Sequence, residues 1–213
     1  MAAEDVHQRF LAIAPKISPH LFQAMVQVGP VDIVSPQYSS GAPFAERLCR
    51  AIAGQQLSVK AARAIWGRVV ASKLEGETLI EDETLMAYFA QVDPNVLRGC
   101  GLSGAKVKAV GAIAQAALSG QLEATELSQL SATERTQRLT ALWGVGQWTA
   151  DMMNIFYFGE PDIWPDGDVA ARKALERLTS KRRKTTRTAA YFSPYRSYLA
   201  LYMWRHVDAT PEE

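Results

Sequence analysis

The sequence is poor in cysteine. Its 213 residues include only Cys49 and Cys100, and these two lack the paired spacing that zinc sites and redox motifs require. Two cysteines are also too few for the disulfide framework of a small secreted protein. We expect both side chains to be reduced thiols in a reducing compartment.

Long apolar runs are absent as well. No stretch approaches the ~18 consecutive apolar residues that a membrane-spanning helix needs. Segment 1–10 carries Glu4, Asp5, His7 and Arg9, which is unlike the basic start and apolar run of a secretory signal. The sequence therefore predicts a soluble, intracellular protein with no membrane partner.

An excess of charge of one sign is missing too. The chain has 23 Lys and Arg against 22 Asp and Glu, a net charge of +1, whereas many nucleic-acid binders are far more basic. If DNA is the partner, main-chain amides must make much of the phosphate contact. One basic run, residues 181–184 with Arg177 and Arg187 beside it, fits either a solvated loop or a phosphate-binding strip.

Apolar residues recur at helical spacing along the chain, while the alternation of a half-buried strand is nearly absent. The sequence thus predicts an all-α fold. Its length and its hydrophobic content of 48% allow a substantial core, with ~70% of the unfolded surface buried, in one domain or two small lobes. The clearest apolar stripes are Phe44, Leu48 and Ile52; Val59, Ala62, Ile65, Trp66 and Val69; and Val107, Val110, Ala114 and Ala117.

Residues that favour helix ends separate these stripes. The predicted N-caps are Ser58, Asp93, Ser103 and Ser131, and the predicted stops or turns are Gly76, Gly101 and Gly120. Segment 29–43 is rich in proline and glycine, which predicts a loop between an N-terminal pair of helices and the rest of the chain.

Residues 142–151, LWGVGQWTAD, are the most informative stretch. Gly144 and Gly146 separate a predicted helix over 133–142 from a second one over 147–158. Glycines permit a positive φ and close approach, so amides at the start of the second helix can bind a phosphate oxygen. An ordinary corner between two helices explains the two glycines equally well.

Three further motifs accompany this hairpin in order along the chain: residues 54–58 (GQQLS), 164–169 (WPDGDV) and 194–198 (PYRSY). Together, from about Pro43 to about His206, they resemble the helix-hairpin-helix superfamily of DNA glycosylases, in particular the alkylpurine (3-methyladenine) DNA glycosylase II family in a short form without the N-terminal β-domain. The resemblance implies one two-lobed helical domain over 1–213 with a cleft between the lobes, the helix-hairpin-helix motif at about 133–158 and a catalytic loop at 162–169.

The resemblance also assigns roles in DNA binding. The residues expected to hold the DNA backbone are Gly144, Gly146, Gln147 and Thr149. A glycosylase must take its target base out of the stack, and the loop before residue 58 is expected to insert a side chain into the duplex. Either Gln56 or Leu57 could be this wedge.

Asp168 matches the aspartate of the family's catalytic loop, and the resemblance implies that it is the catalytic carboxylate. An ionised carboxylate can stabilise an oxocarbenium-like sugar or orient water against C1′. Asp168 also precedes an amphipathic segment, so it fits an N-cap as well. Asp166 is the second candidate, and a calcium loop built from Asp162, Asp166 and Asp168 lacks the regular ligand spacing.

Relatives that cleave the strand through a Schiff base carry a lysine near the start of the second hairpin helix, where this chain has Gln147 and Trp148. Without that amine there is no nucleophile for an imine, so the resemblance implies a monofunctional glycosylase that hydrolyses the N-glycosidic bond of alkylated purines and leaves an abasic site. Two cysteines also exclude a four-cysteine iron–sulfur cluster.

The substrate pocket is expected to be aromatic, because an alkylated purine is cationic and stacks on electron-rich rings. The resemblance points to Trp148, Trp204, Met152 and Tyr157, with Tyr195 and Tyr198 as weaker candidates. Core packing accounts for each aromatic side chain at least as well. Met152 and Arg205 stand where some relatives have tyrosine, and the sequence does not determine which lesion is preferred.

No cofactor is expected to be required. The resemblance implies a structural Na⁺ or K⁺ bound by the main-chain carbonyls of Thr140, Leu142 and Val145. The expected partner is double-stranded DNA with alkylated bases, bound by a monomer in the cytoplasm at the nucleoid, or in the nucleus of a eukaryote. Two alternatives are a non-catalytic helix-hairpin-helix DNA-binding module and a glycosylase that also acts as a lyase.

Overall fold

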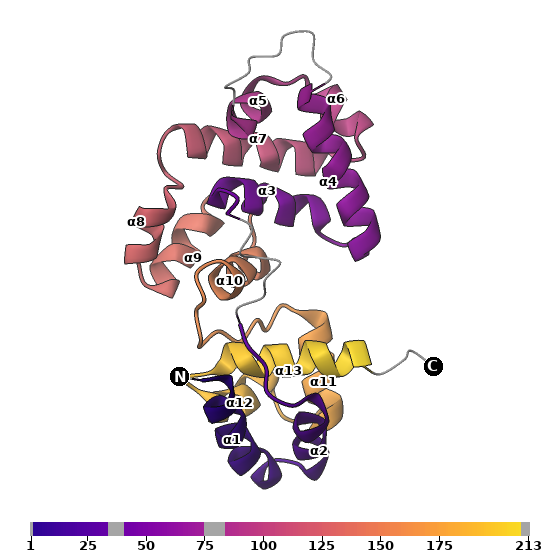
Figure 1. The fold of residues 1–213 in the computed structure, drawn as a ribbon, viewed down its shortest axis with the longest axis vertical. Coiled ribbons are helices and arrows are strands. Elements are labelled where there is room, and N and C mark those ends of the chain that lie inside the picture. The colour runs from indigo at the N-terminus through magenta and orange to yellow at the C-terminus, as the bar shows by residue number, and fades with distance from the viewer. Residues whose placement is uncertain (1, 34–40, 75–83, 210–213) are drawn as a thin grey trace. The chain divides into compact units, whose positions relative to one another are not determined.

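The computed structural model describes residues 2–33, 41–74 and 84–209, and over these ranges it consists of helices and connecting segments without a strand. The predicted all-α fold is confirmed (Figure 1). The helices are α1 (Ala3–Ile13), η1 (Ala14–Lys16), α2 (Pro19–Val28), α3 (Phe44–Gly54), α4 (Val59–Leu74), α5 (Leu85–Gln91), α6 (Pro94–Gly99), α7 (Gly104–Leu118), α8 (Ala124–Gln129), α9 (Ala132–Thr140), α10 (Gln147–Phe156), α11 (Val169–Leu178), α12 (Thr185–Ala189), η3 (Ala190–Phe192) and α13 (Arg196–Ala209).

The predicted N-caps are confirmed. A side-chain oxygen accepts a hydrogen bond from an amide of the first turn at each predicted N-cap, namely Ser58, Asp93, Ser103 and Ser131. Such a cap stabilises a helix by about 1 kcal/mol because it satisfies an amide that the helix itself leaves unpaired. Gly101 and Gly120 have φ values of +106° and +78° at turns, and Gly76 lies outside the described residues.

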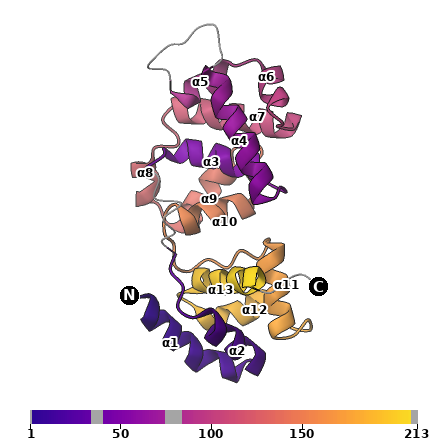
Figure 2. The same cartoon turned by 45° about the vertical axis from the view of Figure 1, so that its right-hand side comes forward.

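The chain divides into two compact units, and unit 2 comprises Gly41–Ala150. In this unit α3 packs against α4 and α7, and α7 also contacts α5 and α6 (Figures 1 and 2). The stripe of Phe44, Leu48 and Ile52 is buried, as the periodicity predicts. The stripe on α4 is predicted correctly only in part, because Val59 is 70% exposed in the first turn of that helix while Trp66 and Val69 are buried.

Unit 1 comprises Met1–Ser40 and Asp151–Glu213, so it joins the two ends of the chain. In its core α13 packs against α11 and α2. The ring of Phe10 lies 4.7 Å from that of Phe192 and 5.6 Å from that of Tyr202, measured between centroids. The His7 imidazole hydrogen-bonds to the Tyr202 hydroxyl. The N-terminal helices therefore complete the core around α13, although almost the whole sequence separates them from it.

The boundary between the two units falls inside α10, between Ala150 and Asp151. The two units correspond to the two lobes expected from the sequence. The expected cleft between lobes and the single functional domain over 1–213 stay predictions.

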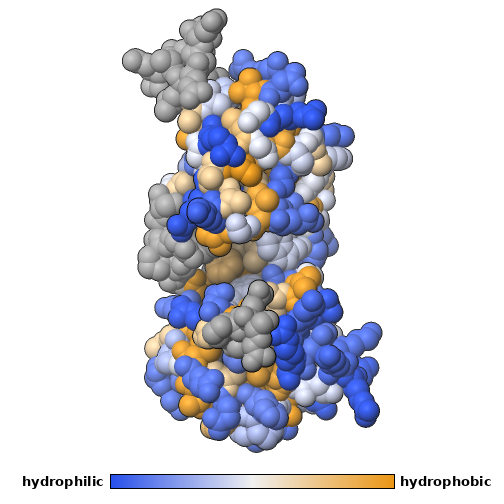
Figure 3. Space-filling model, turned by 90° about the vertical axis from the view of Figure 1, so that its right-hand side faces the viewer, coloured by the Kyte–Doolittle hydropathy of each residue, from blue (hydrophilic) through white to orange (hydrophobic). Residues whose placement is uncertain are grey.

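Cys49 and Cys100 are free and buried, and burial, with the charge of Glu46, raises the pKa of the Cys49 thiol well above its usual range. Within the described ranges no helix has the length and apolarity to cross a membrane. On the face drawn in Figure 3, apolar residues lie in small patches among polar ones.

Candidate active site and DNA-binding elements

The hairpin lies between α9 and α10, close to the predicted place. The first helix ends at Thr140 instead of residue 142, because the Ala141 amide caps it and the Leu142 amide turns back to the Leu139 carbonyl at 3.1 Å. The second ends at Phe156 instead of residue 158, because the amides of Tyr157 and Phe158 both donate to the Met153 carbonyl. Bonds that reach back three residues, as from Leu142 to Leu139, or five, as from Phe158 to Met153, close a helix rather than extend it.

The two glycines of the hairpin have different roles. Gly144 has φ +84°, and a Cβ atom there would lie 2.6 Å from the Cβ of Ala109 in α7. Only glycine satisfies both demands. A Cβ at Gly146 would meet no atom within 4 Å, so nothing within the protein requires glycine there, and the surface beside this residue is open.

The residues predicted to hold the DNA backbone are only partly exposed. Gly144, Gly146 and Gln147 lie at the surface. The side chain of Thr149 is buried, and its hydroxyl accepts a hydrogen bond of 2.9 Å from Nε2 of Gln55. Because Thr149 as a whole residue is only 1% exposed, its predicted contact with the DNA backbone stays a prediction.

The loop between α3 and α4 exposes both predicted wedge residues. Gln56 is exposed and has φ +59°, in the left-handed region that residues other than glycine rarely adopt. Leu57 is 40% exposed. Such backbone strain persists only where the surroundings enforce it. The structure thus brings both candidates to the surface, and the bond between Gln55 and Thr149 links their loop to the first turn of α10.

Lys106 supports this loop, a role that we did not predict from the sequence. Its Nζ donates to the carbonyl oxygens of Ala53 at 2.9 Å and Gln55 at 2.8 Å. The two carbonyls lie at the C-terminal end of α3, where a cation also complements the helix dipole. Burial lowers the pKa of the Lys106 ammonium. No local pattern marks this lysine, because its partners are more than 50 residues away.

Asp168 is the N-cap of α11, as its position in the sequence predicts. Its Oδ1 accepts hydrogen bonds from the Ala171 amide at 2.8 Å and from the indole Nε1 of Trp204 at 3.0 Å. These two donors come from different helices, so they hold the carboxylate in one orientation. The N-terminus of α11 complements its negative charge. Capping and catalysis are therefore compatible roles for this side chain.

The other two carboxylates of the loop hold its backbone in place. Oδ1 of Asp166 accepts from the Trp164 indole at 3.2 Å and from the Thr185 hydroxyl at 2.7 Å. Asp162 binds Arg196, with Nε to Oδ1 at 2.7 Å and Nη2 to Oδ2 at 3.0 Å. Burial alone would raise the pKa of Asp162, but hydrogen bonds from Arg196 and Ser193 and the guanidinium charge together lower it.

These partners argue against a calcium loop, because each of the three carboxylates is bound to different protein donors. Among the described residues, no group of three or more His, Cys, Asp or Glu side chains could hold a metal ion. Asp166 and Asp168 each accept two hydrogen bonds through Oδ1, so these bonds alone do not distinguish their roles, and the catalytic role of Asp168 stays a prediction.

Beside Asp168 lies an aromatic pair. The Trp204 ring is 5.6 Å from that of Phe156, at an angle of 32°, and both side chains are half-buried. Phe156 was not among the predicted pocket residues. Its place four residues after Met152 on α10 is the signal that could have suggested it, since residues four apart share a helix face.

The other predicted pocket residues are more dispersed. Met152 is buried, at 8% exposure, in the part of α10 that belongs to unit 1. Tyr157 follows α10, half-buried, with its ring 5.0 Å from that of Phe158. Trp148 is half-buried in the first turn of α10 and belongs to unit 2. Trp204, a member of the predicted set, donates a hydrogen bond to Asp168.

The carbonyls predicted to bind a monovalent cation lie in the hairpin. That of Leu142 accepts the Val145 amide at 3.1 Å, which leaves one lone pair of this oxygen for an ion. Val145 is buried beneath the turn. This arrangement is compatible with a weakly held cation, and the Na⁺ or K⁺ site stays a prediction.

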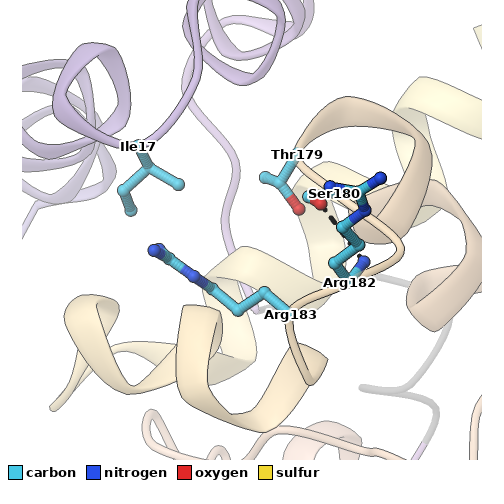
Figure 4. A pocket seen from close by; sticks show the side chains of 5 residues that line it. All are labelled: Ile17, Thr179, Ser180, Arg182 and Arg183. Atoms are coloured by element: carbon cyan, nitrogen blue, oxygen red, sulfur yellow. Dashed lines mark hydrogen bonds between the residues drawn. The ribbon is translucent and has the colours of Figure 1, made fainter.

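The basic run at 181–184 borders a hollow of about 320 Å³ in unit 1. Its lining is Ile17, Thr179, Ser180, Arg182 and Arg183. Figure 4 shows the Arg183 side chain extending toward Ile17, whereas Arg182 lies on the side of Ser180. The hollow has no aromatic ring and no carboxylate in its lining, so it does not have the composition of the base-binding pocket.

Comparison with known proteins defines the class of molecule. Residues 49–193 match the HhH-GPD superfamily of base excision DNA repair proteins. This range includes the loop before α4, the hairpin and the loop that ends at Asp168. The chain belongs to this superfamily.

Particular relatives agree with this assignment. The chain is 32% identical to DNA-3-methyladenine glycosylase 1 of Schizosaccharomyces pombe over 166 residues, which are 75% of this chain and 71% of that protein. The structure resembles that of an S. pombe 3-methyladenine DNA glycosylase in complex with abasic DNA, with a TM-score of 0.75 and 27% identity over 92% of this chain and 95% of the other. A DNA-3-methyladenine glycosidase from Bacillus halodurans gives a TM-score of 0.73 and 28% identity over 95% and 89% of the two chains.

Proposed function

We propose that this protein is a monofunctional DNA glycosylase that removes alkylated purines, of the 3-methyladenine and 7-methylguanine type, from double-stranded DNA. One observation carries the proposal. A carboxylate in the superfamily's catalytic loop, Asp168, is fixed at a helix N-terminus by the indole of Trp204. The relatives that are named as 3-methyladenine glycosylases support the choice of substrate.

The chemistry requires little from the protein besides this carboxylate. An alkylated purine already carries positive charge, so the N-glycosidic bond breaks with its electron pair going to the base, and no general acid is needed. The sugar then develops oxocarbenium character, which a fixed carboxylate stabilises. Asp168 also orients a water molecule, whose oxygen adds to C1′ while one of its protons passes to this carboxylate, leaving an abasic site.

Hydrolysis without strand cleavage is supported by the residues at the start of α10. Gln147 and Trp148 occupy the place where a lyase relative would carry its lysine, and neither side chain forms an imine. Lys106 lies in the same unit as α10's first turn, but its amine is held by the main-chain carbonyls of Ala53 and Gln55. We therefore do not propose it as the nucleophile of a lyase. The expected product is therefore an alkali-labile but uncut strand.

Binding of the base is proposed for the aromatic side chains. Trp204 and Phe156 present two rings next to Asp168, and stacking of a cationic base on an indole contributes about 0.5–2 kcal/mol. Met152 and Tyr157, which belong to the same unit as Trp204, are proposed to complete the pocket. Substrate choice among methylated purines stays broad in this proposal, since one methyl group changes discrimination by only about 1–3 kcal/mol.

DNA is proposed to bind as a duplex to one monomer, with the hairpin amides on a phosphate and Gln56 or Leu57 in the space that the base leaves. This mode reads no sequence, because phosphate contacts position the protein without distinguishing bases. It suits an enzyme that must find damage in any context.

The decisive test is release of free methylated base from alkylated duplex DNA by the wild type and by Asp168→Asn, with DNA affinity measured in parallel at one salt concentration. The matched control is Asp166→Asn, which changes a carboxylate of the same loop that bonds only to Trp164 and Thr185 in the described structure. We expect release by the wild type and the control, and binding without release by Asp168→Asn.

The same experiment addresses the non-catalytic alternative. A helix-hairpin-helix binding module has no use for a fixed carboxylate, so all three proteins would bind DNA equally and none would release base. Trapping of a covalent DNA adduct with borohydride would instead point to a lyase.

A further inference from the structure

Lys108, an exposed residue of α7, contacts the aromatic ring of Trp143 in the hairpin. Nζ of Lys108 is 4.3 Å from the centroid of the Trp143 ring. Trp143 is 46% exposed, directly before Gly144 in the turn. Both residues belong to unit 2, and the proposed mechanism of base release uses neither of them.

Packing between α7 and the hairpin places Lys108 there. Gly144 lies so close to Ala109, the residue after Lys108, that a residue with a Cβ atom would not fit in place of Gly144. Lys106 and Lys108 are two residues apart on α7, and at 3.6 residues per turn they point about 200° apart around the helix. Lys106 holds the loop before α4, and Lys108 faces the hairpin.

The ammonium of Lys108 has an unusual environment for a surface cation. No carboxylate among the described residues forms an ion pair with it. Its neighbour is the face of an indole, which attracts a cation without neutralising its charge. The positive charge is thus restricted in position and remains available to an anion.

We infer that Lys108 and Trp143 form a phosphate-binding site that extends the hairpin, and that its ligand is a DNA backbone phosphate next to the one bound by the hairpin amides. This inference rests on the proposed DNA-binding role of the hairpin. Amides are uncharged, and a net charge of +1 provides no general attraction to DNA. A positioned ammonium supplies the charge that the hairpin lacks.

The salt dependence of binding tests the site directly. Each phosphate neutralised by a lysine on B-DNA steepens the slope of log K against log salt by about 0.9. We expect Lys108→Gln to reduce the slope for an undamaged duplex by about this amount. Lys173→Gln, which removes an exposed lysine from α11, is the charge-matched control and should leave the slope unchanged. An unchanged slope for Lys108→Gln, or equal reductions in both variants, would overturn the inference.

The role of the indole is tested separately. Trp143→Phe keeps an aromatic face for the ammonium and should retain the wild-type affinity within about twofold, whereas Trp143→Leu frees the lysine and should weaken binding several-fold at low salt. Equal affinities for the two variants would contradict the role of the ring. Far-UV circular dichroism and thermal unfolding establish that each variant is folded.

Because undamaged DNA is used, this result is independent of base release. A reduced slope in Lys108→Gln together with no base release by the wild type would support the phosphate site and reject the enzyme. Base release with an unchanged slope would support the enzyme and reject the site.

Discussion

The two units present different kinds of functional groups. In unit 2 the surface elements are turns, namely the hairpin with Gly144 and Gly146 and the loop with Gln56, and what they expose is mostly main chain and uncharged side chains. In unit 1 the key group is one half-buried carboxylate, Asp168, which two donors hold in place. The proposed binding of DNA is therefore spread over many weak contacts, whereas the proposed chemistry depends on a single side chain.

The difference predicts that variants of the two regions have separable defects. Changes in unit 2 should weaken DNA binding or base flipping in graded steps. Changes around Asp168 should lower the rate of base release while leaving affinity intact.

Gly144→Ala should have the largest effect on the binding side. The new methyl group would lie 2.6 Å from Ala109 at a φ of +84°, so the hairpin must shift away from α7. We expect a loss of about 1–3 kcal/mol in unfolding free energy and at least a tenfold loss of DNA affinity. Gly146→Ala, which meets no protein atom, is the control for stability. Chemical denaturation and fluorescence anisotropy measure the two effects. If Gly144→Ala had the unfolding free energy of the wild type, the prediction would be wrong, and the protein would accommodate the new methyl group beside Ala109 without strain.

Trp204→Phe should have a smaller effect, which falls chiefly on the rate of base release. Phenylalanine keeps an aromatic ring beside Phe156 but removes the N–H that donates to Asp168 at 3.0 Å. A hydrogen bond to a charged group contributes about 1.5–3 kcal/mol, so the single-turnover rate should fall by about tenfold or more at saturating enzyme. The control is Phe156→Leu, which leaves that bond in place. If Trp204→Phe lost affinity but kept its rate, the indole would be binding DNA or base instead of orienting Asp168.

Lys106→Met should separate flipping from binding within unit 2. It removes both hydrogen bonds to the carbonyls before Gln56 but keeps a side chain of similar length. We expect base release from a fully paired lesion to slow several-fold, with less effect when the lesion lies in a mismatch that costs less to unstack. Fluorescence of a 2-aminopurine next to the lesion reports flipping. Equal slowing on both substrates would mean that Lys106 does not act through the loop.

The smallest effect concerns acid stability in unit 1. The pKa of Asp162 is lowered in the folded protein, so its pair with Arg196 stabilises the fold above the unfolded pKa of about 3.9 and loses this contribution as the pH falls through the lower folded pKa. The Arg196 side chain is 37% exposed, and solvent screening limits the contribution to less than about 1 kcal/mol. Asp162→Asn should thus be less stable than the wild type at pH 6 but nearly equal to it at pH 2 to 3 in urea unfolding. A constant difference over this range would exclude the ion pair as its source.

Features that depend on neighbours along the chain were predictable. The N-cap role of Asp168, the caps at Ser103 and Ser131 and the position of the hairpin all follow from local residue preferences, and the structure confirms them. The exposure of Val59 was not predicted correctly. The apolar stripe of α4 begins at this residue in the sequence, but in the structure the stripe is buried only further along the helix, at Trp66 and Val69.

Contacts between distant residues could not be predicted in the same way. Trp204 lies 36 residues from Asp168, and Lys106 lies 51 residues from Gln55. The spacing of apolar residues along the sequence does not indicate either contact. Phe156 was not predicted as a pocket residue for a similar reason, because it lies at the site through the contact of its ring with Trp204 on another helix.

The sequence by itself therefore determined the helical class, the N-caps and the superfamily motifs, because these depend on periodicity, capping and glycine placement within a few residues. Only the tertiary structure decided that Trp204 orients Asp168, that Lys106 holds the loop before α4 and that Gly144 must lack a side chain beside Ala109. These contacts arise when helices from separate parts of the chain pack together, and side-chain geometry at such interfaces depends on the whole core rather than on local sequence.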